Sequence, residues 1–171
     1  MTSNKMALVI PAELENKMDE VITHYPVSVR SAVLPILHLM QEHFRFIGED
    51  VVNWVATKLS LEPIQVLEVV TFYPGFRQSA PGKYHIRVCR TLSCAMSGSY
   101  ELMEALCQTA KIDRSHCDHH HPFAVSEDGK YSIEFAECLA SCGFGPVCMV
   151  EDDFFEKVEP SKAADILAKY Q

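Results

Sequence analysis

Residues 84–94 read Tyr84-His-Ile-Arg-Val-Cys-Arg-Thr-Leu-Ser-Cys94, and residues 138–142 read Cys138-Leu-Ala-Ser-Cys142. The first stretch opens with an alternating segment that places Ile86 and Val88 on one face, which predicts a strand ending at Cys89. Each stretch sets two cysteines a few residues apart where a predicted strand gives way to a loop. Two such loops facing each other supply four thiolates, the ligand set of a tetrahedral zinc ion or of an iron–sulfur cluster.

The spacing of these cysteines distinguishes between the possible kinds of metal centre. The two pairs read C-x4-C and C-x3-C, whereas structural zinc favours the tighter C-x2-C, so an iron–sulfur cluster is favoured and zinc stays an alternative. Plant-type ferredoxins also open with C-x4-C, but their third cysteine would fall at Ser97, which excludes that class. A dithiol redox site is disfavoured because the sequence has no C-x-x-C.

Composition bounds the remaining classes. The chain has 171 residues, a formal net charge of -8 and seven cysteines. The acidic balance argues against nucleic acid and anionic membranes as partners. We expect a cytoplasmic protein without membrane insertion, because no apolar run approaches about 18 residues and the N-terminus resembles no leader. In a reducing compartment, cysteines point to metal binding rather than to a disulfide framework.

The cysteines divide the chain into two predicted domains. All seven follow Val88, so residues 1–80 form a cysteine-free region and residues 81–171 a cysteine-bearing one, with the boundary inside 77–82. Apolar spacing predicts helices over 11–24, 29–44, 51–59 and 63–70. Pro11 and Pro63 are expected in first helical turns, and Asp50 as the N-cap of the third helix. Pro35 must either lie in a first turn or kink its segment.

The second region changes its hydrophobic period. It predicts a helix over 97–110, strands over 84–89, 123–125, 131–135, 146–150 and 154–158, and a last helix capped by Ser161 and ending near Tyr170. The expected fold class is therefore α+β, with an N-terminal helical bundle followed by an α/β domain.

The sequence around the four cysteines resembles a known family. C-x4-C followed by C-x3-C is the pattern of the thioredoxin-like [2Fe-2S] ferredoxins, and the chain is similar to one branch of them, the 24 kDa (NuoE-type) subunits of NADH:quinone oxidoreductase. The stretches that carry the resemblance are Arg30–Gln41, Val66–Tyr73, Gly82–Cys89, Glu137–Cys142, and Pro146–Val150 continued through Phe154 and Phe155 to Lys157.

The resemblance implies a thioredoxin-like domain that holds one [2Fe-2S] cluster per chain on Cys89, Cys94, Cys138 and Cys142. It also implies a flavin-bearing, NADH-oxidising (NuoF-type) partner subunit that carries the FMN and binds NADH, together with other peripheral-arm subunits. The chain would then act at the cytoplasmic face of the inner membrane as an electron-transfer subunit without a catalytic residue of its own.

Two features depart from the family pattern, and two others bear on the site. The region between the helix over 97–110 and the next strand, which contains His116 to His121, is longer than usual, and Ala140 replaces a frequent glycine. Pro146 resembles the cis-proline of thioredoxin folds. We also expect Gly143 and Gly145 to let backbone N–H groups approach the sulfurs.

Charge around the second cysteine pair predicts a low reduction potential. Nine acidic and two basic residues lie between Glu127 and Glu159, and negative surroundings disfavour an added electron. The amides near the sulfurs would act in the opposite direction, so which effect dominates stays open.

Several side chains have a plainer interpretation. Cys107 and Cys148 are expected to be small buried hydrophobes, and His38 and His85 to be structural. The loop containing Cys117 and the histidines at 116 and 119–121 is expected to be solvated, with divalent-ion binding as the alternative. G-F-G-P at 143–146 lacks the spacing of a dinucleotide fingerprint, so NADH and FMN should bind elsewhere.

Alternative functions remain. Residues 51–70 resemble a helix-turn-helix, but the second helix has no Arg or Lys, which disfavours DNA binding. A diaphorase-type subunit of an NAD-linked hydrogenase or formate dehydrogenase fits the same motifs, and a zinc-stabilised binding module is the alternative from another class.

Overall fold

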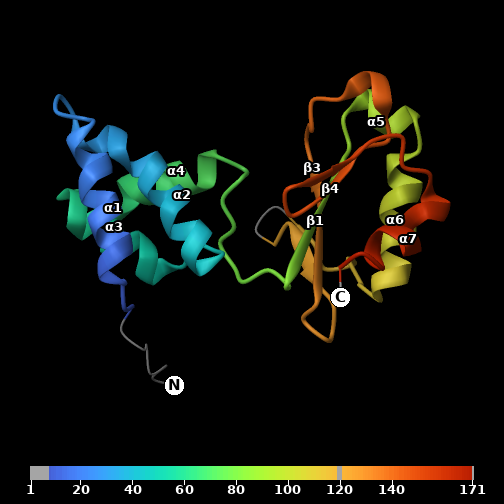
Figure 1. Ribbon diagram of the computed structural model, residues 1–171, viewed down its shortest axis with the longest axis horizontal. Coiled ribbons are helices and arrows are strands. Elements are labelled where there is room, and N and C mark those ends of the chain that lie inside the picture. Colours follow the sequence, from blue (N-terminus) through green and yellow to red (C-terminus); the bar gives the residue numbers. More distant parts are fainter. Residues whose placement is uncertain (1–7, 119–120, 171) are drawn as a thin grey trace. The chain divides into compact units, whose positions relative to one another are not determined.

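The computed structural model describes residues 8–118 and 121–170 of the chain (Figure 1). Its internal contacts divide the chain between Ala80 and Pro81 into two compact units, here called the helical unit and the sheet unit. Within the described residues, no helix is long and apolar enough to cross a bilayer.

The helical unit packs helices around one apolar core. Its described part contains α1 (Ala12–Thr23), the 3-10 helix η1 (Val29–Ala32), α2 (Val33–Phe44), α3 (Glu49–Leu59) and α4 (Pro63–Phe72). The core side chains recur at helical spacing and include the fully buried Met18, Ile36, Leu37, Met40, Val55 and Val66. The expectation of helices in this region is confirmed.

Two prolines set where helices begin in this unit. Pro63 is the first residue of α4, as expected, and the Glu62 N–H before it donates to Gln65 Oε1 at 3.0 Å. Pro35 lies in the first turn of α2, where its missing N–H costs no helical hydrogen bond. The helix expected over 29–44 is two elements, because residues 29–32 form the 3-10 turn η1. Pro11 immediately precedes α1 instead of lying in its first turn.

The expectation that Asp50 caps the third helix is wrong. The N-cap of α3 is Gly48, and Asp50 lies in the first turn, where its Oδ1 accepts the N–H of Val51 at 2.9 Å. A Cβ on Gly48 would come within 2.6 Å of that Asp50 oxygen, so the carboxylate occupies the space a capping side chain would need. Asp50 still places negative charge at the positive end of the helix.

The sheet unit contains β1 (Tyr84–Cys89), β2 (Phe123–Val125), β3 (Tyr131–Ala136), β4 (Cys148–Val150) and β5 (Asp153–Phe155). In the described part they form one sheet in the order β2-β3-β1-β4-β5. β1 is parallel to β3, and the other neighbouring pairs are antiparallel. Parallel neighbours need a crossover, and α6 (Ser99–Ala110) lies on that connection.

Helices pack against this sheet to form a second core. α6 contacts β1 and β3, and α7 (Ala163–Leu167) lies beside α6 (Figure 1). Fully buried Ile86, Val88 and Ile133 of the sheet belong to the same core as Leu102 and Leu106 of α6. A helical unit followed by a mixed sheet with helices against it confirms the α+β fold class.

Several boundaries in the sheet unit differ from expectation. The short helix α5 (Leu92–Met96) precedes α6 and is absent from the predicted elements. Ser161 lies inside the 3-10 helix η3 (Pro160–Lys162), so it does not cap the last helix, which begins at Ala163. The last strand ends at Phe155, because Lys157 adopts a left-handed φ of 51° that a strand cannot contain.

Candidate metal centre

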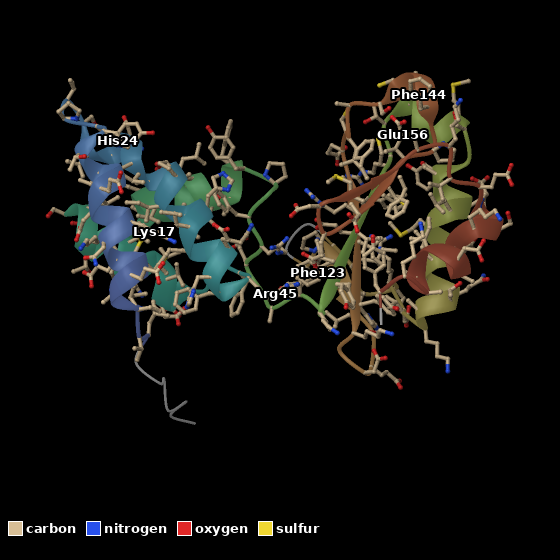
Figure 2. All side chains as sticks on the ribbon, viewed as in Figure 1. Lys17, His24, Arg45, Phe123, Phe144 and Glu156 are labelled. Carbon is tan, nitrogen blue, oxygen red and sulfur yellow. The ribbon has the colours of Figure 1, made fainter. Side chains whose placement is uncertain are left out.

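The two cysteine-bearing loops lie at the same end of the sheet. Cys89 is the last residue of β1 and lies opposite Ala136, the last residue of the parallel strand β3. Cys138 follows two residues later, and the first cysteine loop forms α5 while Cys142 begins the 3-10 helix η2 (Cys142–Phe144). α5 and η2 are in contact, so the loops lie side by side at this end. Figure 2 shows Phe144 and Glu156 at the same end, close to α5.

The cysteine pairs differ in their exposure. Cys89 and Cys94 are 3% and 2% exposed and pack with the buried Val147 and with Leu139 of the second loop. Cys138 and Cys142 are exposed. Among the described residues, no group of three or more His, Cys, Asp and Glu side chains is gathered closely enough for a single metal ion. The site is therefore a buried pair and an exposed pair of thiols on adjacent loops.

Backbone amides are directed at the sulfurs. Burial opposes ionisation of Cys89, but hydrogen bonds from the backbone of Thr91 and Leu139 lower the pKa of its thiol. Burial raises the pKa of Cys94 to about 11, although a hydrogen bond from the Val147 backbone acts in the other direction. The Ala140 N–H lies 3.3 Å from Cys138 Sγ. Amide donors around thiolate sulfurs compensate the negative charge of an iron–sulfur centre, so this donor set fits a [2Fe-2S] cluster.

The two glycines of the second loop differ in how closely they approach a sulfur. The amides named above belong to non-glycine residues, and a Cβ on Gly143 would meet nothing within 4 Å. A Cβ on Gly145, by contrast, would lie 3.3 Å from both Cα and Sγ of Cys94. The Gly145 backbone therefore approaches a cysteine sulfur closely, as expected, whereas a side chain at Gly143 would meet open space. The Gly145–Pro146 peptide is cis, as the thioredoxin resemblance implied.

The backbone conformation of Ala140 favours glycine, the residue that the family resemblance leads one to expect at this position. Its φ is 58°, in the left-handed region where an L-residue is disfavoured and glycine is not. The strained residue lies between Cys138 and Cys142, in the loop that carries the exposed pair.

The acidic residues of this region lie at both ends of the sheet. Glu127 and Asp128 lie in the turn that precedes β3, which is parallel to β1, and Glu151 and Asp152 lie in the turn that follows β4, which is antiparallel to β1. Both turns are therefore at the end of the sheet opposite the cysteines. Two other acids lie at the cysteine end of the sheet. Glu137 forms an ion pair with Arg90, and Glu156 accepts a hydrogen bond from Ser141 Oγ. The expected concentration of negative charge around the second cysteine pair is therefore wrong, because the chain reverses direction between the strands.

The remaining cysteines and His85 lie outside the two ligand loops in sequence and have other surroundings. Cys148 is fully buried in β4, where burial raises the pKa of its thiol to about 12, and Cys107 is half-buried against the same core. His85 is 1% exposed, with Nδ1 2.8 Å from Ser132 Oγ and Nε2 2.9 Å from Glu134 Oε1, so its structural role is confirmed. Of the proposed histidine loop, residues 119 and 120 lie outside the described residues, and Cys117 is half-buried.

Sequence reasoning missed the pair formed by Arg90 and Glu137. Arg90 directly follows Cys89, and Glu137 directly precedes Cys138. Opposite charges next to the two ligand motifs were the available signal, but only the parallel register of β1 and β3 shows that they meet.

The geometry agrees with comparisons across known proteins. The model of the thioredoxin-like [2Fe-2S] ferredoxin family matches residues 18–171, and the chain belongs to this family. The E subunit of NADH-quinone oxidoreductase from Rickettsia conorii is 33% identical over 161 residues, which cover 91% of this chain and 90% of that protein. The E subunit from Aquifex aeolicus is 32% identical over 166 residues, which cover 97% of this chain and 98% of that protein.

A solved structure supports the fold. An NAD+-reducing [NiFe]-hydrogenase in the air-oxidized state superposes on 81% of this chain with a TM-score of 0.65 and 17% sequence identity. The matched region is 22% of that hydrogenase chain, so this chain spans about a fifth of it. At this identity the likeness concerns the fold alone.

Proposed function

We propose that this chain holds one [2Fe-2S] cluster on Cys89, Cys94, Cys138 and Cys142 and serves as an electron-transfer subunit of NADH:quinone oxidoreductase. The observation that carries the proposal is the meeting of two thiol pairs on adjacent loops, with backbone amides directed at their sulfurs. Two irons each need two thiolates from the protein, and this site supplies thiols in two pairs. Family membership and the relatives from NADH-quinone oxidoreductase support the same assignment.

Residues of this chain would bind the [2Fe-2S] cluster and shield one side of it from water. The bound cluster supplies one-electron chemistry. Cys89 and Cys94, backed by Val147 and Leu139, exclude water from one side. Cys138 and Cys142 face outward, which leaves the other side accessible to a docked protein.

The partner in this proposal is a flavin-bearing, NADH-oxidising subunit of the NuoF type. It would carry FMN and bind NADH, and single electrons would pass between its flavin and the centre held by this chain. Together with other peripheral-arm subunits it would place the chain at the cytoplasmic face of the inner membrane. The relatives from NADH-quinone oxidoreductase, matched over most of their length, support this setting.

A second candidate is the equivalent subunit of an NAD-linked hydrogenase. The fold match to a chain of an NAD+-reducing [NiFe]-hydrogenase favours it, but the relatives from NADH-quinone oxidoreductase match at higher identity. Both candidates use the same ligand residues and differ in the electron acceptor beyond the flavoprotein.

The decisive experiment uses the chain co-purified with a flavin-bearing subunit of the NuoF type. NADH should produce the electron paramagnetic resonance signal of a reduced cluster only when that flavoprotein is present. Cys138→Ser should alter or abolish the signal, and the matched control Cys117→Ser, in the loop that follows α6, should leave it unchanged. A signal unaffected by Cys138→Ser would contradict the ligand assignment, and failure of NADH to reduce the centre in the complex would contradict the partner.

A further inference from the structure

The residues next to the two ligand motifs form a connection between the ligand loops. Beyond the last register pair of β1 and β3, the Arg90 N–H still donates to the carbonyl of Ala136 at 3.0 Å. The two strands therefore remain paired up to the point where Cys89 and Cys138 leave the sheet.

Side chains continue this pairing past the end of the sheet. Arg90 Nε lies 3.0 Å from Glu137 Oε1, and Nη2 donates to the same oxygen. The Thr91 hydroxyl donates to the Glu137 carbonyl, and Cys89 Sγ lies 4.0 Å from that carbonyl oxygen. The residue after one ligand is thus tied, through side chain and backbone, to the residue before another.

The guanidinium of Arg90 also contacts an aromatic side chain of the sheet. Its Cζ lies 5.9 Å from the centre of the Phe135 ring, and Arg114 Cζ lies 4.8 Å from the same ring centre. A planar guanidinium near an aromatic ring and bonded through two nitrogens loses less freedom than a lysine would. The Arg90 and Glu137 side chains are 41% and 71% exposed, so the pair contributes little to overall stability. Its position between the two loops suggests another role.

We propose that Arg90 and Glu137 are a positioning pair that fixes the separation of the two ligand loops and thereby the lifetime of the bound centre, while their two charges act on its reduction potential in opposite directions. This inference rests on the proposed function, because it concerns the group held by the four cysteines. The pair would act on the centre through Cys89 and Cys138.

Because Arg90 and Glu137 have opposite charges, a positioning role can be distinguished from a purely electrostatic effect on the reduction potential. Adding an electron makes the centre more negative, so loss of the Arg90 charge disfavours reduction and lowers the potential. Loss of the Glu137 charge favours reduction and raises the potential. A positioning role predicts that both losses shorten the lifetime of the centre, although they move the potential in opposite directions.

The test uses the full chain with variants Arg90→Gln, Glu137→Gln, the double Arg90→Gln/Glu137→Gln and the charge-reversed double Arg90→Glu/Glu137→Arg. The matched control is Lys162→Gln/Asp165→Asn, which removes an exposed ion pair of 3.1 Å at the start of α7. Lifetime is read from the decay of visible absorbance in a chelator, potential from redox titration of the paramagnetic signal, and folding from thermal unfolding of the cluster-free chain.

Both single variants and the neutral double should lose absorbance severalfold faster than wild type, while the charge-reversed double recovers most of the lifetime. The potential should fall in Arg90→Gln, rise in Glu137→Gln and return close to wild type in the neutral double. A wild-type lifetime in the neutral double, or potentials that shift in the same direction in both single variants, would overturn the positioning pair while leaving the cluster intact. A wild-type chain containing zinc without sulfide would overturn the proposed function and this inference with it.

Discussion

Gly145 packs directly against Cys94, so that a Cβ on this glycine would lie 3.3 Å from the cysteine's Sγ. The contact joins the two cysteine loops, because Cys94 belongs to the first and Gly145 follows the second. Contacts this short leave no room for a methyl group unless the cysteine moves.

The first prediction follows from this contact. Gly145→Ala should displace Cys94 by a few tenths of an ångström and lower the iron content retained after purification. Gly143→Ala is the matched control in the same loop, since a Cβ there meets nothing within 4 Å. Iron per chain in the two variants measures the effect, and equal occupancy would show that the contact does not constrain the site.

Ala140 supports a second prediction. Replacement by glycine relieves a left-handed conformation that costs roughly 1–2 kcal/mol for an L-residue, but it adds unfolded-state entropy worth about 0.4–1 kcal/mol. Ala140→Gly should therefore raise the free energy of unfolding of the cluster-free chain by up to about 1 kcal/mol. Ala105→Gly, inside α6, should lower it by about 1 kcal/mol. Urea unfolding followed by circular dichroism compares them, and a destabilised Ala140→Gly would contradict the account.

A third prediction concerns thiol reactivity. In the cluster-free chain at pH 8, iodoacetamide should modify the exposed Cys138 and Cys142 first. Cys148 should react last, because burial raises the pKa of its thiol to about 12. Loading the cluster should protect Cys138 and Cys142 and leave the rate at Cys117 unchanged. Mass spectrometry of the peptides reads each site, and equal modification of Cys138 before and after loading would exclude it as a ligand.

The helical unit supports a fourth prediction, on pH dependence. Lys58 of α3 lies 2.7 Å from Asp19 and 2.8 Å from Glu15 of α1, and its pKa is raised by the hydrogen bonds to Asp19 and Glu15. The folded-state pKa of Lys58 exceeds the unfolded value of 10.5. The contribution of these ion pairs to the free energy of unfolding is therefore full below pH 10.5 and declines as the pH rises through the folded-state pKa.

Lys58→Met should therefore lower the free energy of unfolding by about 1 kcal/mol at pH 8, and the difference from wild type should shrink as the pH rises above 10.5. Fluorescence of Trp54, the single tryptophan, reports on α3 during urea unfolding. Lys17→Met is the control, because its 3.4 Å pair with Glu13 is exposed. A Lys58→Met difference that grows with pH would contradict the assigned sign.

Local sequence signals predicted much of the fold. Proline positions and apolar spacing placed the helices of the helical unit, because Pro63 and the buried positions of α2 act through neighbours a few residues away. α5 escaped prediction because its five residues lie within the C-x4-C loop, too short to show a helical period.

The sequence predicted which cysteines form the candidate site better than it predicted the charged residues around them. The spacing of the cysteines and the family resemblance indicated the four residues, but strand direction determines which charges accompany them. Asp128 and Glu151 are close to the second cysteine pair in sequence, yet the turns that hold them lie at the other end of the sheet. Glu137 meets Arg90 only through the parallel register of β1 and β3, which no local pattern encodes.

The central claim is the presence of one [2Fe-2S] cluster, and elemental analysis with electron paramagnetic resonance of the anaerobically purified chain tests it most directly. The account predicts about two irons and two acid-labile sulfides per chain, with a spin-half signal after reduction. One zinc per chain without sulfide, and no signal on reduction, would contradict it.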